Sequence, residues 1–373
     1  MPVKVTYPHM GNMAIGVKAM LEELGVEVVL PPPITKKTLT LGTKYGPEFA
    51  CLPLKLNLGN FIEAYELGAD TILMAGGTGP CRFGYYAYVE QEILKDLGIN
   101  YDLLVLEPPE RNIMEFIAKL KKITDNKPIF QVIRAVKKGF LKIKAADEIE
   151  KKVAFFRARE ITKGATDRVW QEFLQNLNRA REEKEIEEAV NQAVVALARI
   201  PMDLARKVLK IGVVGEIFTL LEPFTNFNIE RYLGNLGVEV QRTIYLSEWV
   251  NDHLFLGLFK NYSRHKEIVK EAPPFLCHFV GGHGQETVGG VKYLKKQGFD
   301  GVIQLLPFTC MPEIVAQAVL PAVSEVEDIP VLSLVVDEHT GEAGLITRLE
   351  AFCDLLSFRQ KGGNHEKRRI SGN

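Results

Sequence analysis

The feature that most constrains this fold is a joint at which an amphipathic helix ends at glycine and an apolar strand begins within a residue or two. It recurs in both halves of the chain, at Glu22–Pro32, Tyr65–Gly77, Lys95–Pro109, Gly234–Tyr245 and Lys295–Pro307. Glycine just past a helix adopts the left-handed conformation that other side chains resist. The strands, such as Val302–Leu306, are nearly continuous apolar runs, which is typical of parallel sheets covered by helices on both faces. The pattern predicts an α/β architecture.

The joints fall into two groups, so the 373 residues divide into several parts. We expect an N-terminal α/β domain over residues 1–136 and a C-terminal α/β domain over residues 209–358. Between them, residues 137–208 have little strand signal but carry apolar helical stripes such as Ile186, Val190 and Leu197, which predict a helical subdomain or lid. Residues 359–373 are rich in basic residues and glycine, and we expect a disordered tail.

Composition narrows the function classes. With 46% apolar and 25% charged residues and a formal net charge of -1, the chain has no signature of a nucleic-acid surface. The first residues lack the pattern of a signal peptide, and no apolar run is long enough for a membrane helix. We therefore expect a cytoplasmic protein without nucleic-acid or membrane partners. Five cysteines in a reducing compartment are not a disulfide framework, so free, metal-bound or reactive thiols remain.

Two of the cysteines lie in periodic segments. Cys353 shares a helical face with Leu349 and Leu356, and Cys277 lies in the strand-like segment Phe275–Gly281. Both patterns are typical of small apolar core residues rather than ligands. We therefore treat these two thiols as internal controls for the others.

The other three cysteines stand in irregular turns beside prolines. Cys51 lies in FACLPLK, Cys81 in GGTGPCRF and Cys310 in LLPFTCMP. Cys81 and Cys310 follow predicted strands and so lie at the carboxyl edge of a sheet, where open α/β folds bind ligands. Helix N-termini predicted after each thiol favour the thiolate, the form that binds metals. Their spacing matches no short metal motif, so chance placement of three free cysteines stays an alternative.

If the three thiols converge, they suit either a 4Fe–4S cluster with one open iron or a zinc site completed by another ligand. A C-x-x-C pair, usual in zinc sites, is absent, and His283 is the best-placed histidine. His283 is an acid–base group, a neighbour of the cluster or a residue of a surface loop. Glu216 is either a cleft carboxylate or the partner of a helix terminus, and Glu313 favours a helix N-terminus.

Glycine-rich turns and tyrosines leave further alternatives. Residues 76–80, 280–290 and 337–344 either cradle the phosphates of coenzyme A or another nucleotide, or are simply tight turns. Tyr85, Tyr86 and Tyr88 are expected to cover an edge of the core. None of these residues receives a catalytic assignment.

At this point the motifs resemble a known superfamily, the cluster-binding subunits of 2-hydroxyacyl-CoA dehydratase and benzoyl-CoA reductase. The chain looks most like the short acyl-CoA dehydratase activase-related (CoA-activase) proteins. The resemblance spans nearly the whole chain and is carried by Phe49–Lys55, Gly77–Tyr86, Val214–Glu230, Val280–Glu286, Leu305–Ala316 and Asp337–Phe352.

This resemblance implies two flavodoxin-like α/β domains and one 4Fe–4S cluster held by Cys51, Cys81 and Cys310. It implies dehydratase or reductase chemistry of an anaerobic metabolism, on an acyl-CoA or another small reducible substrate. A separate ATP-dependent activator would donate the electrons. No P-loop G-x-x-x-x-G-K-[ST] occurs, so we do not expect the chain to be an ATPase. A homodimer or a heterodimer with a related subunit is expected. The alternatives are a non-catalytic cluster scaffold or electron-transfer partner, and a zinc-binding α/β protein.

Overall fold

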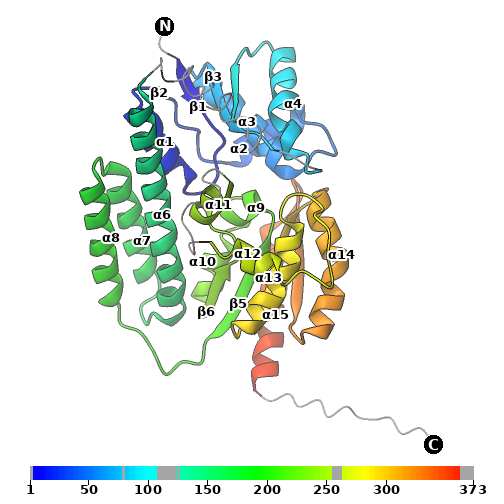
Figure 1. Cartoon of the computed structure of the whole chain (residues 1–373). Helices are drawn as coiled ribbons and strands as arrows, with labels where there is room; N and C mark the ends of the chain where they lie inside the picture. The colour runs from blue at the N-terminus through cyan, green and yellow to red at the C-terminus, as the bar shows by residue number, and fades with distance from the viewer. Residues whose placement is uncertain (1–2, 78–79, 107–123, 125–126, 254–262, 362–373) are drawn as a thin grey trace, which may run out of the picture.

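Two parallel sheets of four strands each form the two α/β units of the protein, one above the other in Figure 1. The computed structural model describes residues 3–77, 80–106, 124, 127–253 and 263–361. The first sheet has the order β2-β1-β3-β4, with β1 Lys4–Thr6, β2 Glu27–Val28, β3 Thr71–Ala75 and β4 Asp102–Leu106. The second has the order β6-β5-β7-β8, with β5 Leu209–Gly215, β6 Val238–Arg242, β7 Gly301–Pro307 and β8 Val331–Val336. The pairings are parallel, and the predicted α/β class with two such domains is confirmed.

Glycine ends helices of the first unit where the sequence predicts it. The helices there are α1 Met13–Glu23, α2 Lys36–Tyr45, α3 Leu52–Glu66 and α4 Phe83–Asp96. Gly68 follows α3 and Gly98 follows α4, with φ of 92° and 76°. A Cβ at either position would meet open space, so the left-handed backbone rather than crowding selects glycine there.

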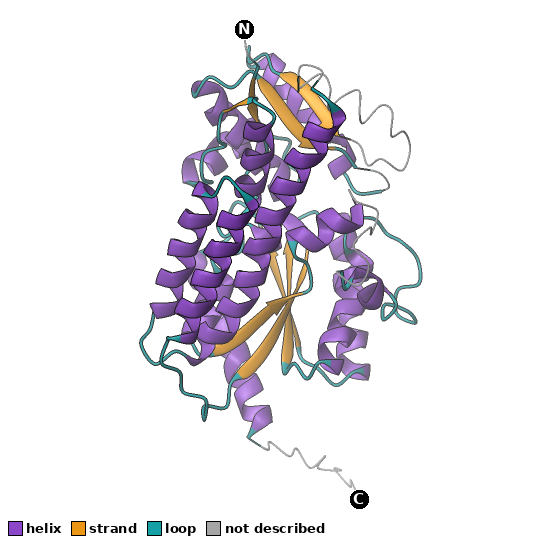
Figure 2. Ribbon diagram, turned by 60° about the vertical axis from the view of Figure 1, so that its left-hand side comes forward, coloured by secondary structure: helices purple, strands orange, loops and turns teal. Residues whose placement is uncertain are grey.

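Three long helices lie beside both units, as Figure 2 shows. They are α6 Ile129–Arg159, α7 Ala165–Arg179 and α8 Glu183–Ala198. They share a core of their own in which Ile149, Leu177 and Leu197 are completely buried. Helix α6 also contacts α1 of the first unit and β6 of the second. The helical layer therefore connects the two α/β units, and α6 begins before the boundary at residue 137 drawn from the sequence.

Helix α3 belongs to the first unit but also packs into the second. The helices of the second unit are α9 Ile217–Leu221, α10 Ile229–Asn235, α11 Leu246–His253, α12 His265–Val269, α13 Gly284–Lys296, α14 Met311–Val326 and α15 Glu342–Gln360. Leu52 and Leu56 of α3 join the core that β5, β7 and α15 form, while Leu58 and Phe61 lie in the core of the first unit. This helix is therefore buried on both sides, between the two sheets.

The prediction of a strand at Phe275–Gly281 with a buried Cys277 is wrong. Cys277 is exposed, and the segment forms turns between α12 and α13. The amides of Phe275 and Leu276 both donate to the carbonyl of Ala272, and the two preceding prolines have no N–H to give to a sheet. Cys353, in contrast, is buried in the core as predicted.

The predicted disordered tail lies outside the described residues from position 362 onward. In the described ranges, none of the helices combines the length and the apolar character needed to cross a bilayer.

Candidate functional site: the three cysteine loops

The loops that carry Cys51, Cys81 and Cys310 meet at one backbone carbonyl. The carbonyl oxygen of Phe49 accepts a hydrogen bond of 2.7 Å from Nη1 of Arg82 and one of 3.1 Å from Oγ1 of Thr309. Phe49 precedes Cys51, Arg82 follows Cys81, and Thr309 precedes Cys310. Three segments far apart in sequence, two from the first unit and one from the second, are thus fastened at one point.

Helix geometry places two of the thiols. Cys51 is the residue before α3 and Cys310 the residue before α14, and each helix has a proline in its first turn. Proline suits that position because the first amides of a helix have no partner within the helix. Both cysteines are buried. Cys51 and Cys310 therefore lie at the N-termini of helices that belong to different units.

Cys81 reaches the same region through Gly282. A Cβ placed on Gly282 would lie 3.9 Å from Sγ of Cys81 and 3.2 Å from Cγ of Pro312. A Cβ placed on the neighbouring Gly281 would lie 2.9 Å from Cγ of Pro80. The turn before α13 thus packs between the Cys81 and Cys310 loops. Thr78 and Gly79 of the predicted glycine turn lie outside the described residues.

The three thiols also influence one another electrostatically. Burial is the main cause that raises the pKa of Cys51 to about 11, and it raises the pKa of Cys81 and of Cys310 as well. Ionised Cys81 raises the pKa of Cys51, and ionised Cys51 raises that of Cys310, so these thiols lie within Coulombic reach. Hydrogen bonds from backbone amides of the following helices lower the pKa of each thiol, but burial raises it by more. The amides at the helix N-termini thus act on the thiol pKa values in the direction expected from the sequence, but the effect of burial is larger.

Tyr86 is a site residue that the sequence reasoning missed. Tyr85 and Tyr88 are exposed, but Tyr86 is buried and its hydroxyl forms a hydrogen bond with Sγ of Cys51. Burial raises the pKa of Tyr86, so its hydroxyl stays protonated and is a donor for a thiolate. The sequence shows three similar tyrosines in one turn of helix, and only their positions around α4 separate them.

Two carboxylates flank the thiols. Glu216 directly follows β5 and caps α9, where its oxygens accept hydrogen bonds of 2.9 Å from the amides of Phe218 and Thr219. The sequence left open whether Glu216 is the partner of a helix terminus or a carboxylate in a cleft. Glu216 also raises the pKa of all three thiols, so it lies near them. Glu313 is completely buried and accepts hydrogen bonds from Thr287 and Gln304, at 2.9 Å each.

The donor set fits a thiolate-binding metal group. Among the described residues, no set of three or more histidine, cysteine, aspartate or glutamate side chains is arranged to hold a single metal ion. A four-iron cluster binds each thiolate to a different iron, so its ligands stand further apart than those of one ion. The buried thiols of Cys51 and Cys310 and the half-buried thiol of Cys81 lie near Glu216, so they are unfavourable sites for thiolates unless a cationic metal group neutralises them. Cys51, Cys81 and Cys310 are donors of the kind that a 4Fe–4S cluster binds.

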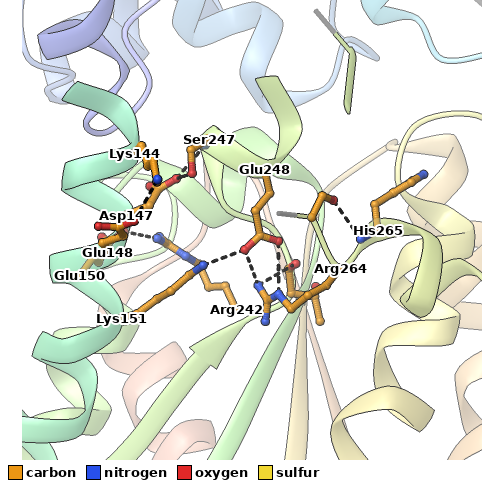
Figure 3. Close-up of polar contacts among 12 residues, drawn as sticks. Lys144, Asp147, Glu148, Glu150, Lys151, Arg242, Ser247, Glu248, Arg264 and His265 are labelled. Carbon is orange, nitrogen blue, oxygen red and sulfur yellow. Dashed lines mark hydrogen bonds and ion pairs between the residues drawn. The ribbon is translucent and has the colours of Figure 1, made fainter. Parts of the chain in front are cut away.

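Charged side chains fasten the units around the site. Nζ of the buried Lys55, one turn after Cys51, binds the carboxylate of Glu338, which follows β8. Figure 3 shows a second network between α6 and the second unit. In it, Glu248 accepts from Lys151 at 2.7 Å and from Arg264 at 3.2 Å. These contacts hold three layers of the protein together, so they support the geometry of the cysteine loops.

Comparisons with known proteins do not assign the chain to a family. No family model matches the chain, and no curated protein is significantly similar to it. The superfamily resemblance therefore rests on the motifs alone.

Proposed function

We propose that Cys51, Cys81 and Cys310 hold one 4Fe–4S cluster between the two α/β units, and that the protein uses it for reductive or dehydratase chemistry. The observation that carries the proposal is the convergence of the three cysteine loops on the Phe49 carbonyl. The Coulombic effects of Cys81 on the pKa of Cys51 and of Cys51 on the pKa of Cys310 support it. We place the protein in the cytoplasm, where thiols remain reduced.

The chain's own residues would prepare the site in three ways. The carbonyl of Phe49 fixes the loops, and the hydroxyl of Tyr86 donates to Cys51. Gly281 and Gly282 let the turn before α13 close against the Cys81 loop. When bound, a 4Fe–4S cluster supplies one-electron transfer, and its fourth iron, with no cysteine ligand, is open to a substrate.

We also propose the partners that the superfamily resemblance implies. A separate ATP-dependent activator donates the electrons, and an acyl-CoA or another small reducible molecule is the substrate. The chain works as a homodimer or with a related subunit. An iron-loaded protein that reacts with none of these substrates would instead be a scaffold or an electron-transfer partner.

Anaerobic reconstitution of the full chain with ferrous iron and sulfide tests the cluster. We expect about four irons and four sulfides per chain in the wild type, as one cubane requires. Cys51→Ala, Cys81→Ala and Cys310→Ala should each lose most of the iron, whereas the controls Cys277→Ala and Cys353→Ala should load normally. Normal loading of Cys51→Ala and Cys310→Ala would refute the proposal. Binding of zinc without iron would favour the zinc-protein alternative.

A further inference from the structure

A second polar cluster lies next to the cysteine loops and has no part in the site described so far. Glu286, in the first turn of α13, is nearly buried, with 12% of its side chain exposed. One carboxylate oxygen lies 2.5 Å from Nδ1 of His265, and the other lies 3.7 Å from Nε2 of His283. A single carboxylate thus stands between two imidazoles.

The two imidazoles face different surroundings. The side chain of His265 is 35% exposed, whereas that of His283 is only 11% exposed. His283 directly follows Gly282, the residue that packs against the Cys81 thiol. The row His265, Glu286, His283 therefore runs from the more exposed imidazole to the turn whose Gly282 packs against the Cys81 loop. Figure 3 labels the outer end of the row, His265.

Neighbouring groups hold this row in place. His253 of α11 stacks on Trp249 at 4.6 Å between ring centroids and meets the ring of His265 edge-on at 6.2 Å. Arg264, which precedes His265, is bound to Glu248 in the network of Figure 3. The imidazole of His265 thus contacts both Glu286 and the ring of His253.

A purely structural role for Glu286 is the simpler alternative, because an acidic residue in the first helical turn is stabilising by itself. A capping glutamate directs its oxygens to backbone amides, as Glu216 does at α9. The oxygens of Glu286 are directed to imidazoles instead. Although burial favours the neutral acid, His283 and His265 hold the pKa of Glu286 below its ordinary value. The hydrogen bond to Glu286 raises the pKa of His265.

We propose that His265, Glu286 and His283 form a proton path between solvent and the three-cysteine site. His283 gives a proton to, or takes one from, the group that reacts there. Glu286 positions His283 and transmits the proton to and from His265. Imidazoles suit this task because they exchange protons near neutral pH. The inference rests on the proposed function, since it assumes that proton-consuming chemistry occurs at the cysteine loops.

Histidine NMR on the iron-free full chain tests the outer contact, between His265 and Glu286. We expect the pKa of His265 to fall in Glu286→Gln and to stay unchanged in His278→Gln, a control at an exposed histidine ahead of the same turn. An unchanged His265 titration in Glu286→Gln would refute the path. The other charged or titratable groups around His265 and Glu286 are Asp252, His253, Lys266 and Glu313.

Redox titration of the iron-loaded chain across pH 6 to 9 tests the link to the site. The wild-type reduction potential should fall as the pH rises, because reduction at the cysteine loops would raise the proton affinity of His283, the inner end of the path. His283→Gln should lose this dependence while keeping its iron, and His278→Gln should behave like the wild type. A potential independent of pH in the wild type, or an equal slope in His283→Gln, would overturn the proton path alone. Failure of the wild type to bind iron would overturn the proposed function, and the path with it.

Discussion

Replacing Glu313 by glutamine removes a buried carboxyl that keeps its proton in the folded protein at neutral pH. Burial raises the pKa of Glu313 to about 8, from an ordinary value of 4.5. Between pH 4.5 and about 8, Glu313 keeps its proton in the folded protein but releases it in the unfolded chain. Folding therefore becomes less favourable as the pH rises through this range. The contribution is complete below about pH 4.5 and is lost progressively up to about pH 8.

The size of the stabilisation follows from the difference between the two pKa values of Glu313. At about 1.4 kcal/mol per pKa unit, the proton on Glu313 stabilises the folded state by about 5 kcal/mol in total, of which about 3 kcal/mol is lost by pH 7. Glutamine does not titrate, and its amide oxygen can still accept from Thr287 and Gln304. Relative to the wild type, the variant should therefore gain about 1.4 kcal/mol for each pH unit between pH 5 and 8.

Urea unfolding of the iron-free full chain measures this gain. The wild type, Glu313→Gln and Glu325→Gln are compared at each pH from 5 to 9, the last being an exposed control on the same helix. The free energies of unfolding of Glu313→Gln and the wild type should diverge with rising pH and become parallel above about pH 8. Parallel curves over the whole range, or curves that converge with rising pH, would contradict a protonated Glu313.

Two further predictions concern packing between elements. Lys55→Met removes the partner of Glu338 from a contact between the two units, and we expect a loss of about 3 kcal/mol in the free energy of unfolding, part of which Glu338→Gln restores. A loss below about 1 kcal/mol would show that the pair is only a surface contact. A Cβ on Gly59 would lie 2.0 Å from the carbonyl oxygen of Thr38, so Gly59→Ala should cost about 3 kcal/mol by forcing α3 from α2. Gly344→Ala, in open space, should be neutral or stabilising, and equal thermal shifts in the two variants would refute the steric argument.

Local signals explain which parts of the fold were predictable. Each glycine joint combines a helix stop, a left-handed residue and an apolar strand, and the strands Thr71–Ala75 and Gly301–Pro307 lie where this pattern puts them. The segment Phe275–Gly281 has the same apolar character, yet Pro273 and Pro274 deprive it of donors and it forms turns. Apolar content alone therefore does not identify a strand.

The candidate site was predictable only in part, because its cysteines carry a signal and their partners do not. Proline beside a thiol and a position after a strand single out Cys81 and Cys310. Tyr86, His265 and Glu286 were not found in this way, whereas the sequence did single out His283. The contacts of Tyr86 with Cys51 and of His265 with Glu286 join different elements and depend on how the helices pack, while His283 and Glu286 are three residues apart at the start of α13.

The cysteine site depends on the docking of the two units. Cys51 and Cys81 lie in the first unit, whereas Cys310 and the Gly282 turn lie in the second. Helix α3 begins at the Cys51 loop, and its Leu52 and Leu56 pack in the core of the second unit. Burial of these two leucines stabilises the interface by about 1.5–3 kcal/mol for each side chain. Helix α3 thus positions the Cys51 thiol and also holds the two units together. A change that separates the units would therefore also move Cys310 away from Cys51 and Cys81.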